Sequence, residues 1–171
     1  MNSLHVKEQD VKIASPPQIR ETPRPLQEGE VLRPLRVCVI NPRYEPSFWG
    51  YDFALPLQPG DKRCWMVSGT LPALAALAPA HCTVELVDEN VEPIDFDNMD
   101  RFAVIGVTGM VVQAKRMHEI LHRLRGARGK VIVGGPYCSV AETQFKELCD
   151  TRFIGEAEDT WPEYLIALGR G

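Results

Sequence analysis

Short apolar runs alternate with amphipathic stretches along most of this chain. Five of the runs are rich in β-branched residues and stop at glycine, proline or polar residues, which is typical of strands buried on both faces of a sheet. The expected strands cover residues 36–40, 83–87, 102–107, 130–133 and 151–154. The fourth is the clearest, because it ends abruptly at Gly134-Gly135-Pro136, residues that cannot continue a strand ladder.

The segments between these runs carry helix signals. The expected helices cover residues 70–78, 110–124, 139–148 and 161–168. The first is apolar nearly all round and is therefore expected to be buried on nearly all sides, and the second has an apolar stripe at helical spacing. Ser139 with Glu142, and Thr160 with Glu163, have capping-box spacing at the start of the last two, and Gly169 would end the last one.

Strands that alternate with helices predict an α/β fold with a doubly wound, five-stranded parallel sheet. We expect a flavodoxin-like (Rossmann-like) strand order, 2-1-3-4-5, with ligands bound beyond the carboxyl ends of the strands. The turns that follow the strands, at 41–42, 108–109, 134–135 and 155–156, would then form one rim.

Two segments stand apart from this pattern. Residues 1–34 contain five prolines among mixed charges, so we expect a flexible, disordered tail ahead of a single domain at 35–171. The loop at 43–68 holds six of the 13 aromatic residues. Such a loop covers a flat apolar ligand, packs on a neighbouring domain, or forms a small core of its own.

Composition narrows the function classes. The 171 residues are 44% hydrophobic and 25% charged, as in a globular domain, and the net charge of −4 argues against nucleic acid as a partner. Neither a membrane-spanning run nor a secretory signal is visible, which predicts a cytoplasmic protein. The five cysteines form no CxxC pair, so no zinc ribbon is expected.

The rim lacks the common nucleotide motifs. Neither GxxxxGK[ST] nor a GxGxxG after the first strand is present. The third strand ends in Val107-Thr108, without the aspartate of a phospho-receiver, and no nucleophile–base pair is evident. Hydroxyl, amide and carboxylate groups at the rim suit holding a ligand better than performing chemistry, so we assign no catalytic and no metal-ligating residue.

Five motifs, taken together in this order, resemble the N-terminal cobalamin-binding domain of B12-dependent radical SAM enzymes, which include many C-methyltransferases. They are Val-Ile-Asn-Pro-Arg (39–43), Leu-Val-Asp-Glu-Asn (86–90), Gly-Val-Thr-Gly-Met (106–110), Gly-Gly-Pro (134–136) and Gly-Glu-Ala-Glu-Asp-Thr-Trp (155–161). The resemblance spans residues 35–168.

The resemblance implies that the benzimidazole tail of cobalamin lies in a slot along the sheet and that the corrin ring covers the strand ends. It assigns these residues to cofactor binding: Asn41, Pro42, Thr108, Gly109, Met110, Val111, Val112, Gln113, Gly134, Gly135, Pro136, Gly155, Glu156, Ala157 and Glu158. Thr108 would hydrogen-bond the tail, the glycines would admit the flat base, and the carboxylates would accept from corrin amides or ribose hydroxyls.

Two departures from related proteins shape the prediction. The loop at 41–68 contains no histidine, so we expect base-off cobalamin without a protein histidine ligand. His118 and His122 have i, i+4 spacing but are expected to be solvated. The CxxxCxxC motif of a radical SAM cluster is absent, so a radical SAM domain or protein, in cis or in trans, would supply the [4Fe–4S] cluster and SAM, and this chain alone would not methylate.

Two other function classes stay open at this point. The chain could be a non-catalytic sensor or interaction domain, or a free-standing enzyme that uses FMN or a nucleotide on the same kind of sheet.

Overall fold

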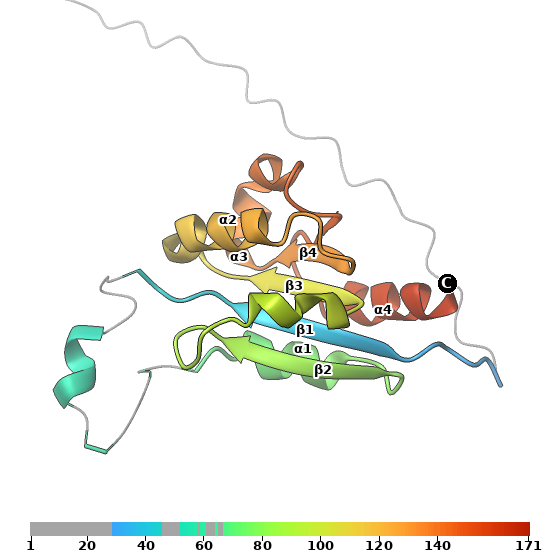
Figure 1. The fold of residues 1–171 in the computed structure, drawn as a ribbon, viewed down its shortest axis with the longest axis horizontal. Coiled ribbons are helices and arrows are strands. Elements are labelled where there is room, and N and C mark those ends of the chain that lie inside the picture. Colours follow the sequence, from blue (N-terminus) through green and yellow to red (C-terminus); the bar gives the residue numbers. More distant parts are fainter. Residues whose placement is uncertain (1–28, 46–51, 58, 61–63, 65–66) are drawn as a thin grey trace, which may run out of the picture.

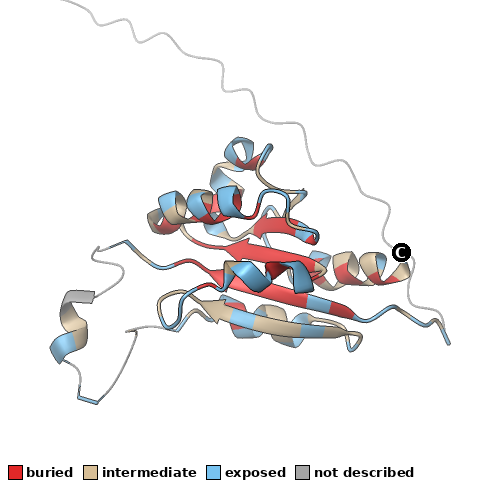
Figure 2. Cartoon of the chain, in the orientation of Figure 1, coloured by how far each residue is buried: buried red, intermediate tan, exposed pale blue. Residues whose placement is uncertain are grey.

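The computed structural model describes residues 29–45, 52–57, 59–60, 64 and 67–171. Its centre is a five-stranded, all-parallel sheet with the strand order β2-β1-β3-β4-β5, as predicted (Figure 1). The strands are β1 (Leu35–Asn41), β2 (Cys82–Asp88), β3 (Val104–Thr108), β4 (Lys130–Gly134) and β5 (Thr151–Arg152). The three central strands are almost wholly buried, since helices cover both faces (Figure 2).

The helices form two layers. They are α1 (Thr70–Leu77), α2 (Ala114–Arg123), α3 (Pro136–Val140) and α4 (Thr160–Arg170), with 3-10 turns η1 (Asp52–Leu57), η2 (Phe96–Arg101), η3 (Val111–Gln113) and η4 (Glu142–Phe145). One core cluster joins α2 and α3 to the sheet, and a second joins α1 and α4 to it. The expected doubly wound architecture is therefore confirmed.

The predicted capping boxes are wrong. Ser139 lies inside α3, which begins at Pro136 because the proline ring presets a helical φ, and its hydroxyl bonds the carbonyl of Gly135 instead. The expected helix at 139–148 breaks at Ala141, where φ is −130°, and resumes as η4. At α4 the N-cap is Asp159, without a side-chain cap.

Two other helical expectations need correction. In α1 only Leu71 is buried, and its other apolar side chains are partly or fully exposed, so the helix is not buried all round. Gly169 lies within α4 instead of ending it. A Cβ at this glycine would be 2.8 Å from Nε2 of His81, so the absence of a side chain allows close packing.

Several expectations fall outside the described residues. They include the tail at 1–28 and most aromatic side chains of the 43–68 loop: Phe48, Trp49, Tyr51, Phe53 and Trp65. The end of the expected tail is described, and there Arg33 donates its backbone N–H to the carbonyl of Gly169. The domain boundary at residue 35 stays a prediction. Within the described ranges, no helix is long and apolar enough to cross a membrane.

Candidate functional site

The strand register brings the predicted rim together at one edge of the sheet. Thr108 at the end of β3 pairs with Gly134 at the end of β4, and Asn41 at the end of β1 pairs with Asp88 at the end of β2. Parallel strands end on the same side of a sheet, which is why turns far apart in sequence meet here.

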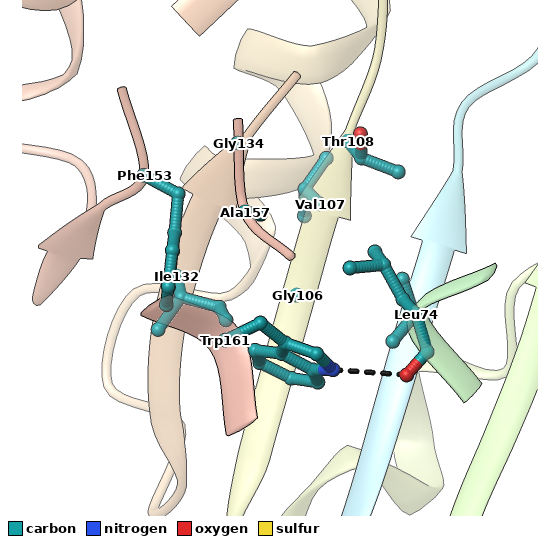
Figure 3. Close-up of a pocket in the computed structure, with 10 residues that line it drawn as sticks. Leu74, Gly106, Val107, Thr108, Ile132, Gly134, Phe153, Ala157 and Trp161 are labelled. Carbon is teal, nitrogen blue, oxygen red and sulfur yellow. Dashed lines mark hydrogen bonds between the residues drawn. The ribbon is translucent and has the colours of Figure 1, made fainter. Parts of the chain in front are cut away.

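A cleft opens between this rim and the helix layer formed by α1 and α4 (Figure 3). It contains about 340 Å³ of empty space, including its open mouth. The lining comes from β1, β3, β4, α1, α4 and the chain around β5: Val39, Leu74, Gly106, Val107, Thr108, Ile132, Gly134, Phe153, Ala157 and Trp161.

Small residues create the space over the centre of the sheet. Gly106 lies in the middle of β3, between Val39 of β1 and Ile132 of β4. A Cβ there would be 3.4 Å from the Ile132 side chain and would project into the cleft lining. Glycine inside a strand weakens it and often marks a place where a ligand approaches the backbone. Because Gly106 has no side chain, the middle of β3 forms a flat floor of the cleft, on which a flat group could lie.

The walls of the cleft are held by Trp161 and its neighbours. Trp161 is buried and donates its indole N–H to the carbonyl of Leu74 at 2.9 Å, which joins α4 to α1 across the cleft. The ring of Phe153 meets the rings of Trp161 and Tyr164 edge-on, with centroids 5.9 and 5.4 Å apart. The width of the cleft is thus set by packed aromatic rings and one hydrogen bond.

Two of the residues that line the cleft have polar side-chain groups. The indole N–H of Trp161 is already bonded to Leu74, and the hydroxyl of Thr108 lies at the carboxyl end of the cleft. Gly135 packs directly against it: φ is +88°, and a Cβ there would be 2.7 Å from Oγ1 of Thr108 and 3.0 Å from the backbone nitrogen of Gly109. The N–H of Tyr137 donates to the carbonyl of Gly109 at 3.1 Å. The Gly-Gly-Pro turn is therefore docked onto the end of β3.

The turn after β5 is tied to the same place. The backbone N–H of Gly155 donates to Oγ of Ser139 at 2.9 Å, so α3 holds the start of the 155–158 turn. Ala157 reaches into the cleft, and its carbonyl accepts from the N–H of Trp161 at 2.8 Å. Glu156 and Glu158 lie exposed at the rim, outside the lining of the cleft.

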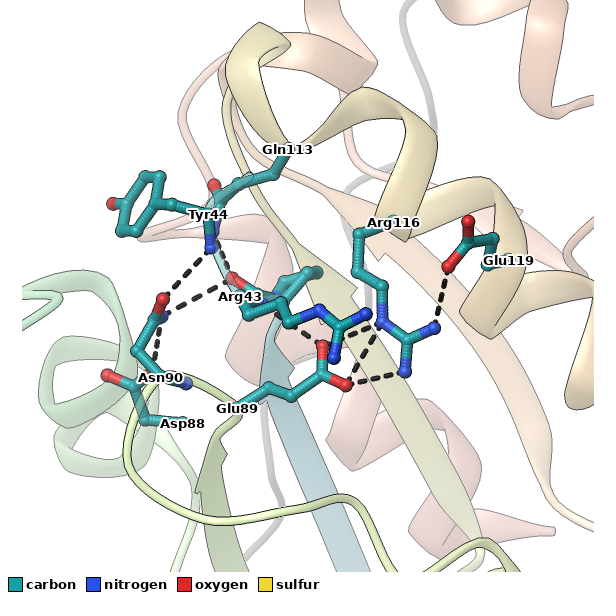
Figure 4. A network of polar contacts seen from close by, with 9 residues as sticks. Arg43, Tyr44, Asp88, Glu89, Asn90, Gln113, Arg116 and Glu119 are labelled. Carbon is teal, nitrogen blue, oxygen red and sulfur yellow. Dashed lines mark hydrogen bonds and ion pairs between the residues drawn. The ribbon is translucent and has the colours of Figure 1, made fainter. Parts of the chain in front are cut away.

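A second group of rim residues forms hydrogen bonds with other residues of the protein (Figure 4). Gln113 is buried and donates its amide to Oδ1 of Asn41, at 3.0 Å, and to the carbonyl of Pro42. Its own Oε1 accepts from the N–H of Met110 at 2.8 Å. These contacts fix the end of β1 against the loop that leaves β3.

A partly buried ion pair lies beside that group. Glu89 and Arg116 have side chains 6% and 14% exposed, and the guanidinium contacts both carboxylate oxygens. The same carboxylate accepts from the N–H of Arg43, and Asn90 accepts from the N–H of Tyr44. Burial alone would raise the pKa of Glu89, but the hydrogen bonds from Arg116 and Arg43 and their charges outweigh it and lower that pKa. The turn after β2 therefore fixes where the 43–68 loop begins.

The predicted site residues fall into three groups. Thr108, Gly134 and Ala157 line the cleft. Asn41, Pro42, Gly109 and Gln113 are buried in the supporting contacts of the rim, and Gly135 packs beside them. The others lie around the rim, partly or fully exposed: Met110, Val111, Val112, Pro136, Gly155, Glu156 and Glu158.

Sequence reasoning missed most of the apolar lining. Val39, Gly106 and Trp161 belong to the motifs of the resemblance but were not assigned to the site. Leu74, Ile132 and Phe153 were predicted only as strand or helix residues. Gly106 was the available signal, because a glycine inside an otherwise β-branched strand needs a reason.

Of the histidine pair, His122 is exposed as expected, but His118 is partly buried. The His118 ring stacks on Phe145 with centroids 5.1 Å apart, and its Nε2 is 3.3 Å from the hydroxyl of Tyr137. Burial and the charge of His122 lower the pKa of His118, against a hydrogen bond to Gln144, which raises it. No three His, Cys, Asp or Glu side chains among the described residues are grouped to hold a metal ion.

Cys138, the cysteine nearest the rim, is fully buried, and burial raises the pKa of its thiol to about 11. A neutral, buried thiol is a poor nucleophile.

Comparison with known proteins shows that the sequence is similar to those of methyltransferases. An uncharacterized methyltransferase of Synechocystis sp. is 30% identical over 139 residues, which are 80% of this chain and 25% of that protein. The hopanoid C-2 methylase of Rhodopseudomonas palustris is 28% identical over 142 residues, 83% of this chain and 26% of the enzyme. The bacteriochlorophyllide d C-8(2)-methyltransferase of Chlorobaculum tepidum is 29% identical over 96 residues, 56% of this chain and 21% of the enzyme.

This is therefore an α/β protein with a flavodoxin-like sheet that is similar in sequence to methyltransferases. The chain spans about a quarter of the length of the relatives that it matches. No family model and no solved structure matches it.

Proposed function

We propose that this chain is the cobalamin-binding part of a B12-dependent radical SAM methyltransferase. The observation that carries the proposal is the cleft over Gly106, at the carboxyl side of a flavodoxin-like sheet, in a chain similar to named methylases. A flat benzimidazole base matches a narrow apolar cleft whose floor a single Cβ would raise.

The residues of this chain would bind and orient the cofactor. Ile132, Phe153 and Trp161 would pack on the base, and Thr108 would donate to or accept from the sugar-phosphate at the cleft's mouth. The rim residues that lie outside the cleft, Val111 and Pro136 among them, would face the ring. When bound, cobalamin supplies a cobalt centre for methyl transfer, and a radical SAM domain or partner would supply the [4Fe–4S] cluster and SAM.

A base-off, histidine-free binding mode belongs to this proposal. The base cannot occupy the cleft and ligate the cobalt at the same time. None of the described histidines lies in the cleft lining. The domain at 35–171 and a cytoplasmic location are part of the same proposal.

Titration with hydroxocobalamin and methylcobalamin, followed by visible absorption, tests it. We expect saturable binding with a shift to the base-off spectrum, and no saturable binding of FMN in a parallel titration. A bound spectrum that stays base-on would refute the cleft as the place of the base. Binding of FMN alone would favour an enzyme of the flavin class.

A sharper test uses Gly106→Val, which fills the floor of the cleft. Cobinamide, which lacks the base, should bind the variant and the wild type equally, while cobalamin should bind the variant much more weakly. Ile105→Val, at the neighbouring strand position, removes one methylene from the core on the other face of the sheet, outside the lining, and serves as a control for general disturbance of β3.

A further inference from the structure

The interior of the cleft offers almost no hydrogen-bonding partner to a bound group. Its lining is aliphatic, aromatic or glycine except for Thr108, which lies at the carboxyl end. The indole N–H of Trp161 is the other polar group, and it already donates to the carbonyl of Leu74.

The backbone of the floor is occupied as well. Gly106 lies between two partner strands, because it pairs with Val39 on one side and with Ile132 on the other. In a parallel sheet the N–H and C=O groups of such a residue are used by its neighbours. A ligand on this floor would meet backbone without free donors or acceptors.

This chemistry distinguishes between flat bases of similar size. A base with ring nitrogens and an amino group along its edge loses hydrogen bonds to water on entering the cleft and regains none there. A base whose edge carries methyl groups loses few hydrogen bonds to water and gains apolar contact with Leu74, Ile132 and Phe153. The two bases are similar in size, so the polarity of the lining, which favours the second, distinguishes them.

We infer that the cleft selects cobamides by their lower base, accepting an apolar-edged benzimidazole and discriminating against a purine such as adenine. This inference rests on the proposed function and specifies its ligand class. The discriminating residues are Leu74, Ile132 and Phe153, which would contact the base edge and whose side chains offer it no polar atom.

The test compares three probes on the full chain by visible absorption: cobalamin, its adenine-containing analogue, and cobinamide, which has no base. We expect cobalamin to bind at least tenfold more tightly than the adenine form, and the adenine form to bind no better than cobinamide. Equal affinity for the two complete cobamides would overturn the inference and leave the proposed function standing. Absence of binding for all three would overturn both.

A variant pair checks the mechanism of selection. Leu74→Gln introduces an amide into the lining and should narrow the ratio between cobalamin and the adenine form severalfold. Leu77→Gln, one turn along the same helix and outside the lining, should leave the ratio unchanged. An unchanged ratio in Leu74→Gln, in protein with a wild-type circular dichroism spectrum, would overturn the assignment of selectivity to this wall.

Discussion

The indole N–H of Trp161 in α4 donates a hydrogen bond of 2.9 Å to the backbone carbonyl of Leu74 in α1. The N–H of Ala78, which would close the helix on Leu74, bonds the carbonyl of Ala75 instead. The Leu74 carbonyl is thus one of the unpaired groups at the end of a helix, and a side chain from another helix satisfies it. This contact connects the two walls of the cleft.

Replacing Trp161 by Phe keeps an aromatic ring but removes the donor. We expect a loss of about 1–3 kcal/mol in the free energy of unfolding, because a part-buried carbonyl loses its partner. Cobalamin affinity should fall as well, since α1 is no longer held against α4. Urea unfolding and the cobalamin titration measure the two effects.

Tyr164→Phe is the comparison variant, since it keeps the ring that meets Phe153 and loses only the hydrogen bond of its hydroxyl with Thr151. A Trp161→Phe protein as stable as this variant would contradict the role given to the Leu74 hydrogen bond.

The second prediction concerns the Gly-Gly-Pro turn. Gly135 and Gly126 both have positive φ, +88° and +84°, but a Cβ at Gly126 would meet nothing within 4 Å. Gly126→Ala should cost about 1 kcal/mol, from backbone strain alone. Gly135→Ala adds a clash with Thr108 and Gly109 and should destabilise the protein by a further 1–3 kcal/mol or so.

Urea unfolding of the two variants separates strain from clash. If both lost the same stability, the close packing of Gly135 on Thr108 would be refuted.

The sheet could be predicted from the sequence because its determinants are local. The β-branched runs at β1, β3 and β4 stop at polar or glycine residues, and alternation with helices leaves few topologies. The helix starts were harder: the serine and threonine spacings matched a capping box, but Gly135-Pro136 begins α3 earlier. A proline at the first helical position outweighs a capping pattern inside the helix.

The cleft could not be predicted in the same way. Its lining comes from elements far apart in the chain, and Leu74 and Trp161 meet only after the sheet has formed. Thr108 and Gly134 were found because they lie at the ends of strands, and Ala157 only through the resemblance. Asn41 and Gln113 also follow strands, but they bond each other, and sequence spacing cannot distinguish these two situations.

The third prediction concerns the ion pair of Glu89 and Arg116. Replacing Glu89 by Gln removes the more buried of the two carboxylates that contact Arg116, and we expect a loss of about 1–3 kcal/mol at neutral pH. Glu119 contacts the same Arg116, but its side chain is 43% exposed. Glu119→Gln should therefore change stability by no more than about 1 kcal/mol.

The pH dependence follows from the lowered pKa of Glu89. Its contribution to stability is complete above the unfolded-state pKa, near 4.5, and is lost as the pH falls through the lower folded-state pKa. Wild type and Glu89→Gln should therefore converge in acid. A stability difference that stayed constant with pH, measured by urea unfolding, would assign the loss to packing instead of charge.

The last prediction concerns His118 of α2, which contacts Tyr137 and Phe145 after β4. Because burial and the charge of His122 lower its pKa, its imidazole should titrate below its ordinary value of 6.5 in an NMR pH titration. His122→Gln removes the neighbouring positive charge and should raise the midpoint. A lowered folded-state pKa means that stability is complete above 6.5 and declines as the pH falls through the folded value. A midpoint at or above 6.5 would show that the ring is hydrated and not stacked on Phe145.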